Sequence, residues 1–109
     1  LPSAATLELV ELLNSAGPYG PGSKAPTFVF ANMQITFFKR IGTSHLRIKF
    51  SDNTGSLDAI CFNAFDNEIG PALENHGGRS LHLCGKLDIN QWRGQRSVQL
   101  RLEDAQFAV

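Results

Sequence analysis

The sequence predicts a mainly β fold, a small barrel of five strands with one short helix between the third strand and the fourth. Three observations lead to this expectation. Apolar residues alternate with a period of two over most of the chain from residue 27 onward, turn-forming residues separate these runs, and one helical stretch interrupts them before Gly77-Gly78. With 109 residues, 42% of them apolar and 18% charged, the chain has the composition of one globular domain with a single core.

The first 26 residues are predicted to form a helix and a connector. Apolar residues from Leu7 to Leu13 follow helical spacing, and Thr6 precedes them as a capping residue. Residues 17–26 hold three Gly and three Pro, a composition that excludes a helix or a central strand and indicates a semi-rigid linker. We therefore expect the barrel to occupy residues 27–109.

The first two strands are predicted to form a hairpin. The apolar residues change parity after Phe30, so we expect a break or bulge near residues 31–32 and a main first strand from about Met33. This parity turns Phe38 outward. After a turn at residues 41–44, the second strand alternates cleanly over residues 45–50. Its inward residues are Leu46, Ile48 and Phe50, and its outward residues are His45, Arg47 and Lys49.

The remaining elements follow in order. Turn residues 51–55 lead to a third strand over 56–62, in which both faces are apolar and neither can be assigned to the core. A short helix is expected over 65–74, a fourth strand over 79–89, a polar turn over 90–95, and then a fifth strand. Five strands with one helix between the third and the fourth is the element order of the oligonucleotide/oligosaccharide-binding (OB) fold.

No self-contained active site is predicted. A hydrolytic site needs a nucleophile with a base, or carboxylates and histidines that converge on a metal. The histidines and central aspartates are scattered over strands, turns and a helix start: His45, His76, His82, Asp52, Asp58 and Asp66. We therefore expect no catalytic residue, no metal and no cofactor in this chain. Whether a longer protein that contains it is an enzyme stays open, and a chain that begins at Leu1 without Met suggests a fragment or a processed product.

The cysteines and the hydropathy indicate a cytoplasmic protein. Cys61 and Cys84 lack a Cys-x-x-Cys spacing and lie in apolar runs, so we interpret them as buried small apolar residues in a reducing compartment, with a disulfide or a metal site as the alternative. No stretch approaches the roughly 18 apolar residues of a membrane span. We expect no membrane partner.

The distribution of charge points to a nucleic-acid interface. Ten Lys and Arg residues balance ten Asp and Glu residues, which argues against binding by bulk attraction but allows a local basic groove. An OB barrel binds oligonucleotides on strands 2 and 3, between the loop that joins strands 1 and 2 and the loop that joins strands 4 and 5. The candidate nucleic-acid-binding residues at these places are Lys39, Arg40, His45, Arg47, Lys49, Trp92, Arg93 and Arg96.

The candidate residues would divide the work of binding. The cations would neutralise phosphates, and the Trp92 ring would stack on a base, with Phe38 as a second stacking candidate. Each residue also has a simpler interpretation: the charges as solvated surface, Trp92 as a lid over one end of the barrel, and Phe38 as a contact of the connector or of another domain. The cluster is stronger than its members because three separate segments would have to be basic at matching places by chance.

Several passages resemble the RecJ family of single-strand-specific 5′→3′ exonucleases. Residues 12–28, with Gly17-Pro18-Tyr19-Gly20-Pro21-Gly22 at their centre, are similar to that family's Pro-Phe-Gly-x-Gly-Asn-Pro-x-Pro-x-Phe passage. Ser23, Lys24 and Ala25 depart from it, because Asn, Pro and Glu are usual there. Similarity to the OB domain of the family extends over five further passages, at residues 45–49, 57–63, 90–94, 99–100 and 103–104.

The resemblance implies that residues 1–26 are the tail of a DHHA1-like region and that the rest is the C-terminal OB domain. Enzymes of this family hold Mn²⁺ or Mg²⁺ through Asp and His motifs of a DHH domain. Neither the Asp-His-His motif nor the Gly-Gly-His motif occurs here, so no catalytic residue can be carried over. The implied role is to bind single-stranded DNA and to guide its 5′ end toward the catalytic core of the parent chain, in DNA repair and recombination.

Two other functions stay open on the sequence alone. The barrel could be a scaffold whose basic face docks on a neighbouring domain or on a partner such as a single-strand-binding protein. It could also be an RNA-binding OB module of the kind that binds tRNA anticodons, since fold and residue types are shared.

Overall fold

The computed structural model describes residues 1–15 and 26–109, so most of the predicted connector lies outside the described residues. A short 3₁₀ helix, η1 (Pro2–Ala4), precedes the first α-helix. The helices are α1 (Leu7–Ser15) and α2 (Ile69–Glu74), and the strands are β1 (Phe28–Ile41), β2 (His45–Asp52), β3 (Gly55–Cys61), β4 (Leu81–Trp92) and β5 (Gln95–Phe107). No helix in this part of the chain is long and apolar enough to cross a membrane.

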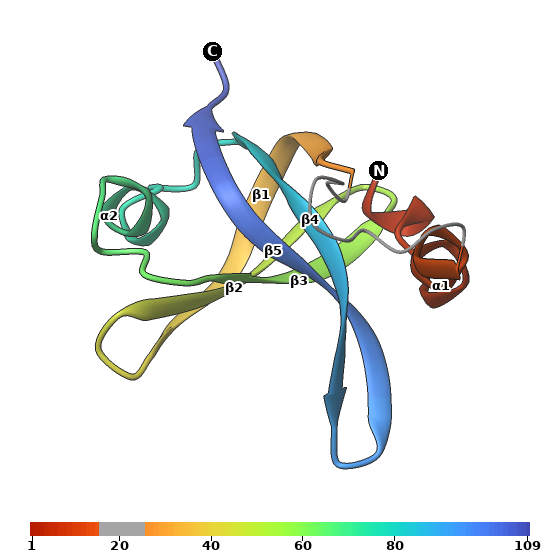
Figure 1. Cartoon of the computed structure of the whole chain (residues 1–109). Coiled ribbons are helices and arrows are strands. Elements are labelled where there is room, and N and C mark those ends of the chain that lie inside the picture. Colours follow the sequence, from red (N-terminus) through yellow and green to blue (C-terminus); the bar gives the residue numbers. More distant parts are fainter. Residues whose placement is uncertain (16–25) are drawn as a thin grey trace.

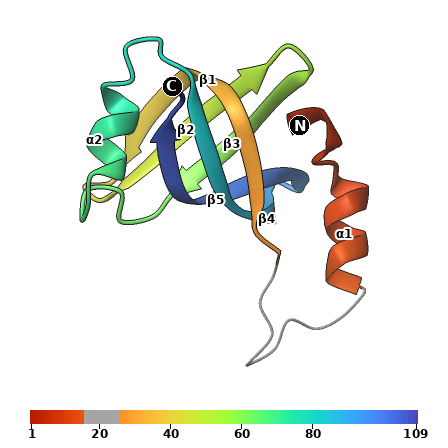
Figure 2. The ribbon, with the colours of Figure 1, turned by 90° about the horizontal axis from the view of Figure 1, so that it is seen from above.

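The five strands close a barrel in the order β1-β2-β3-β5-β4 (Figure 1). All neighbouring pairs are antiparallel except β3 and β5, which run parallel and close the barrel. The predicted element order is confirmed, with α2 between β3 and β4. Figure 2 shows α1 and α2 on opposite sides of the barrel.

Both helices follow local rules of the sequence. The Leu9 amide donates to Thr6 Oγ1 at 3.1 Å, which confirms Thr6 as the cap of α1. The helix α2 is shorter than expected because it begins at Ile69 and not at residue 65. Pro71 does not interrupt it, since the first turn of a helix has no use for the missing proline N–H.

The core settles the faces of the third strand. Leu57, Ala59 and Cys61 are buried inside the barrel, while Asp58 and Ile60 lie on its outer side. At the centre of the core, the rings of Phe30 and Phe50 meet edge to face with their centroids 5.3 Å apart. Cys61 and Cys84 are both free thiols.

β1 contains two register shifts, of which the sequence analysis predicted one. The first lies between Phe30 and Met33, as expected, and the strand continues through it from Phe28, so the start predicted at about Met33 was wrong. Asn32 takes a left-handed φ of 58° there, and its amide donates to His82 Nδ1 at 3.1 Å.

The second register shift lies between Ile35 and Phe37 and corrects the prediction for Phe38. Ile35 faces Phe50 in the core, but one residue is then skipped and Phe37 pairs with Lys49 on the outer side. Phe38 therefore does not point outward with Arg47. It pairs with buried Ile48, and its ring meets that of His76 beside α2, with centroids 6.1 Å apart.

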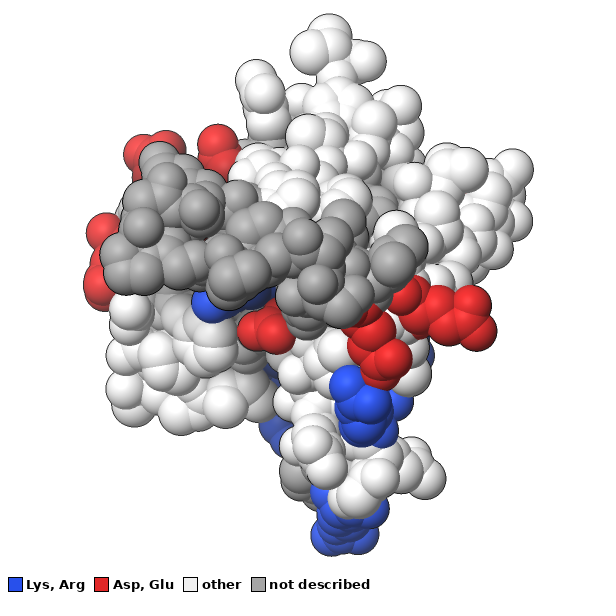
Figure 3. All heavy atoms as spheres, turned by 45° about the vertical axis from the view of Figure 1, so that its right-hand side comes forward, with Lys and Arg blue, Asp and Glu red and all other residues white. Residues whose placement is uncertain are grey.

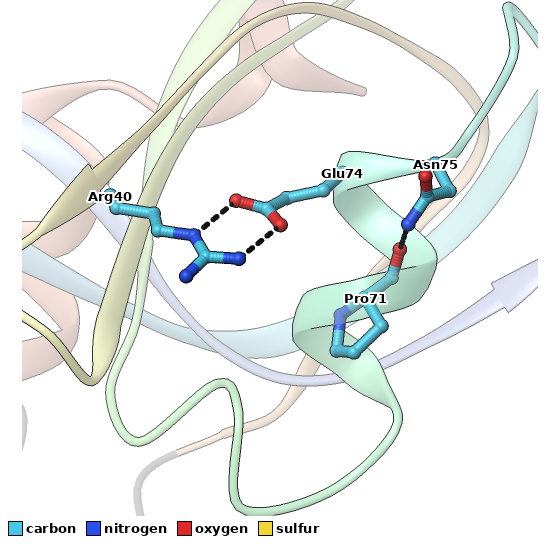
Figure 4. Close-up of polar contacts among 4 residues, drawn as sticks. All are labelled: Arg40, Pro71, Glu74 and Asn75. Carbon is cyan, nitrogen blue, oxygen red and sulfur yellow. Dashed lines mark hydrogen bonds and ion pairs between the residues drawn. The ribbon is translucent and has the colours of Figure 1, made fainter.

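One ion pair ties α2 to the end of β1. Arg40 donates to both carboxylate oxygens of Glu74, from Nε at 2.7 Å and from Nη2 at 2.8 Å (Figure 4). Its guanidinium carbon also lies 4.2 Å from the centre of the Phe65 ring. At the end of the helix, the Asn75 side chain donates to the Pro71 carbonyl at 2.7 Å. The Arg40–Glu74 pair holds α2 against the end of β1, and the Asn75 bond closes the last turn of the helix.

β4 bends at Gly85, where its register with β5 shifts. A Cβ atom at this buried position would overlap the Arg101 carbonyl oxygen and lie 2.9 Å from the carbonyl carbon. Both atoms belong to the backbone of β5 and cannot move without breaking the sheet.

We predict that Gly85→Ala destabilises the fold by about 1–3 kcal/mol or more, the usual cost of overpacking a core. Gly55→Ala is the matched control, because a Cβ there meets only Ser3, at an ordinary 3.8 Å. Urea unfolding of the two variants measures the difference. Equal stability of both would contradict the close approach of β4 and β5.

We also predict a pH-dependent effect of Glu74→Gln. The hydrogen bond from Arg40 lowers the pKa of Glu74 from its ordinary value of 4.5. A lowered carboxyl pKa stabilises the fold fully above the ordinary value, and this contribution is lost as the pH falls through the lower value in the folded protein. At neutral pH, Glu74→Gln should therefore melt at a lower temperature than the chain without substitutions. The difference between the two melting temperatures should disappear at acid pH.

The control for this prediction is Arg40→Gln, alone and combined with Glu74→Gln. If the two residues act as one pair, the double variant loses little more than either single variant. A melting difference that persists unchanged at acid pH would show that Glu74 acts without its charge.

Candidate nucleic-acid interface

The register of the strands places a set of side chains together on the outer side of β1, β2, β3 and β5, which we call the β2–β3 face. Directly paired residues of neighbouring strands project to the same side of a sheet. One row across the face contains Lys39, Arg47, Ile60 and Arg101. The next row contains Phe37, Lys49, Asp58 and Gln99.

Three of the predicted cations lie on this face. Lys39, Arg47 and Lys49 are all exposed, and Lys39 and Arg47 are direct partners across β1 and β2. Arg47 Nη2 lies 3.7 Å from Asp58 Oδ1, which is longer than a hydrogen bond of about 2.7–3.2 Å. The Arg47 guanidinium is therefore only loosely held and can reach a ligand.

A groove of about 360 Å³ opens between this face and the β4–β5 hairpin. Its lining residues come from four strands: Arg47, Asp58, Asn90, Gln95, Arg96, Ser97 and Gln99. Both hairpins, β1–β2 and β4–β5, extend toward the bottom of Figure 1, on the same side of the barrel. The structure therefore brings Arg47 and Arg96 into one groove, although 49 positions separate them in the sequence.

The β4–β5 hairpin carries two more of the predicted cations, Arg93 and Arg96. Arg93 and Gly94 form its tip, with left-handed φ angles of 51° and 76° that suit a two-residue turn. The arm that projects downward in Figure 3 shows Lys and Arg atoms at its end, while Asp and Glu atoms appear higher, on the body. Arg93 is exposed but does not line the groove. The side chain of Trp92 lies outside the described residues.

Arg96 has a carboxylate partner from the N-terminal helix. Its Nη1 lies 2.7 Å from Glu11 Oε1, and both side chains are about half exposed, at 48% each. The pair connects α1 to the hairpin beside the groove. Because an exposed pair of this kind is weak, typically worth about 0–1 kcal/mol, a phosphate can compete for Arg96.

The structure directs two predicted residues to other partners. Arg40 turns to the opposite side from Arg47 and is held by Glu74, as described above. His45 is half-buried, and its Nδ1 accepts the Asn63 amide at 3.0 Å. The His45 ring packs against that of Phe62 with centroids 5.3 Å apart, so this histidine orients an aromatic side chain.

Phe37 and Phe62 are candidate stacking residues that the sequence analysis missed. They are 45% and 54% exposed, among the exposed large apolar residues of the described chain. Phe37 shares its row with Lys49, and Phe62 follows β3 beside His45. The signal for Phe37 was the pair Phe37-Phe38, since one of two adjacent strand residues must face outward, but only the bulge decides which.

Nothing among the described side chains forms a metal site, since no three His, Cys, Asp or Glu residues lie close enough together to hold an ion. The site is built from cations, exposed aromatic rings, neutral hydrogen-bonding groups and one carboxylate, that of Asp58. Such a surface can bind a polyanion with flat apolar groups, which is the chemistry of a single nucleic-acid strand.

Two solved structures share the fold. The mitochondrial single-stranded DNA binding protein Rim1 from S. cerevisiae superimposes with a TM-score of 0.56 and 11% identity, over 77% of this chain and 95% of that one. The second single-stranded DNA binding protein of Mycobacterium smegmatis, SSBb, gives a TM-score of 0.53 and 18% identity, over 78% of this chain and 87% of that one. These likenesses confirm the OB fold.

Curated relatives are much closer in sequence. The single-stranded-DNA-specific exonuclease RecJ of Escherichia coli (strain K12) is 33% identical over 105 residues, which are 94% of this chain and 17% of that protein. The enzyme of the same name from Dickeya dadantii (strain 3937) is 36% identical over 100 residues, or 90% of this chain and 16% of that protein. The chain thus spans about a sixth of the length of these relatives. The model of the RecJ OB domain family matches residues 1–104, and the chain belongs to that family.

Proposed function

We propose that this chain is the single-stranded DNA-binding module of a RecJ-like 5′→3′ exonuclease and guides the strand to a catalytic core that lies outside it. One observation carries the proposal. Exposed Phe37 alternates with the exposed cations Lys39, Arg47 and Lys49 on one face of the barrel, beside a groove that contains Arg96. Cations for the phosphates and rings for the bases are what sequence-tolerant binding of a single strand requires.

The neutral net charge does not oppose this proposal, because charge is segregated along the chain. Residues 33–51, which supply half of the residues in the two rows, contain four Lys and Arg residues and no Asp or Glu, and three of these cations lie on the face. Residues 52–76, which include α2, contain five Asp and Glu residues and no Lys or Arg, and of these five Asp58 lies in the two rows of the face. A strand that approaches the β2–β3 face meets a positive surface even though the whole chain is neutral.

The parent protein enters the proposal through its relatives. Both relatives carry the name single-stranded-DNA-specific exonuclease, so the parent is proposed to be a hydrolase with a DHH/DHHA1 core that holds Mn²⁺ or Mg²⁺. Its proposed setting is DNA repair and recombination in the cytoplasm. Contact of the barrel with that core, and with a single-strand-binding protein, are further proposals.

Binding to this face is predicted to depend on the salt concentration. The chain without substitutions should bind labelled oligo-dT with an affinity that falls steeply as the salt concentration rises. The double variant Arg47→Gln/Lys49→Gln should bind more weakly. The magnitude of the slope of log affinity against log salt should fall by about 1.4, roughly 0.7 for each phosphate contact removed from a single strand. Fluorescence anisotropy over a salt series measures both quantities.

Arg79→Gln is the matched control for this charge removal. Arg79 lies two residues before Leu81, the first residue of β4, at the end far from the hairpin, and its guanidinium lies over Phe107. Its loss should leave the salt slope unchanged. A slope that is equal in all variants would overturn the assignment of the face. A folded chain that binds neither DNA nor RNA of the same sequence would favour the scaffold function. A preference for the RNA would favour the function of an RNA-binding OB module.

The second prediction separates stacking from charge. Phe37→Ala should cost about 1–3 kcal/mol of binding free energy and leave the salt slope unchanged, because a base loses its stacking partner but no phosphate contact is lost. Phe38→Ala is the control. The two rings are adjacent and almost equally exposed, at 45% and 42%, but only Phe37 lies on the β2–β3 face. Equal losses from both variants, measured by the same titration, would contradict the register of β1.

A further inference from the structure

One residue of the groove does not fit a surface made only to attract phosphates. Asp58 lies at the centre of the β2–β3 face, paired across the sheet with Lys49 on β2 and Gln99 on β5. Its side chain is 32% exposed and lines the groove. A carboxylate in this place repels a phosphate backbone, so its presence calls for a different partner.

The rest of the lining consists of hydrogen-bonding groups. Besides Asp58, the groove is lined by two guanidiniums, one hydroxyl and three carboxamides: Arg47, Arg96, Ser97, Asn90, Gln95 and Gln99. Its volume of about 360 Å³ lies within the roughly 300–1,000 Å³ of ordinary small-molecule sites. Since every lining residue carries a hydrogen-bonding side chain, the groove can bind the polar edge of a base.

The closeness of Asp58 and Arg47 in the groove limits which bases can satisfy both side chains. Unpaired bases expose their Watson–Crick edges. Guanine presents two adjacent donors, N1–H and the N2 amino group, which match the two oxygens of a carboxylate, and next to them the acceptor O6, which matches an arginine. Thymine presents a single N–H between two carbonyl oxygens, and adenine and cytosine each place an acceptor beside the amino group. Only guanine satisfies Asp58 with two hydrogen bonds.

We propose that this groove is a base subsite that prefers guanine, with Asp58 as the specificity-determining residue and Arg47, whose five N–H donors can serve a phosphate and a base together, as the donor to O6. The proposal rests on the single-strand binding proposed above. The 3.7 Å between Arg47 Nη2 and Asp58 Oδ1 leaves both groups available, because a closed ion pair would have used their hydrogen-bonding capacity on each other.

The test compares short oligo-dT strands that carry one central dG, deoxyinosine or no substitution. Deoxyinosine keeps N1–H and O6 but lacks the N2 amino group, so it removes one of the two donors to Asp58. We expect the dG strand to bind roughly 5- to 10-fold more tightly than oligo-dT, the lower part of the range for a bidentate base contact, with deoxyinosine between them. The barrel closes its own core, so the titrations use the chain itself.

Asp58→Asn tests the role of the carboxylate. The amide is isosteric and offers only one acceptor oxygen, so the preference for dG over deoxyinosine should disappear even if overall affinity rises with the loss of negative charge. Asp66→Asn is the matched control, since it removes the same charge from an exposed residue that does not line the groove. It should keep the preference.

The outcomes separate this inference from the proposed function. If the chain without substitutions binds all three strands with equal affinity, the guanine subsite is overturned and single-strand binding stays intact. A preference for dG that survives in Asp58→Asn would overturn the role of Asp58. Failure to bind any strand would overturn the proposed function and the subsite together.

Discussion

The residue skipped between Ile35 and Phe37 is the constraint on which the binding face depends. Before the bulge, β1 buries Met33 and Ile35 against the core; after it, the same strand turns Phe37 and Lys39 outward beside Lys49 and Arg47. After the bulge, Phe38 and Arg40 turn to the side of α2. One extra residue thus lets a single strand serve the core, the outer face and the contact with α2 along its 14 residues.

Ion pairs divide the basic residues into two groups. Arg40 is held by a two-point contact with Glu74 and an aromatic ring, and this geometry stabilises the position of α2. Arg96 is held by a single exposed contact with Glu11, and Arg47 only loosely by Asp58. The strength of the carboxylate contact therefore separates a structural arginine from those that stay accessible to a ligand.

The β2–β3 face and the groove complement each other chemically. Toward β1 and β2 the surface offers cations and an exposed ring, which suit phosphates and the flat sides of bases. Toward β3 and β5 the groove offers carboxamides, a hydroxyl and a carboxylate, which suit base edges. Closure of the barrel through the parallel β3–β5 pair puts these two halves side by side.

The sequence by itself determined the order of the elements, the cap of α1, the inward residues of β2 and the segments in which basic residues gather, because each depends on local periodicity or composition. Only the tertiary structure decided that Phe37 and not Phe38 faces outward, that Arg40 serves α2, and that Arg47 and Arg96 meet in one groove. Strand register and long-range ion pairs depend on how the closed barrel aligns segments distant in the chain, and a period of two in the sequence does not reveal where an extra residue is inserted.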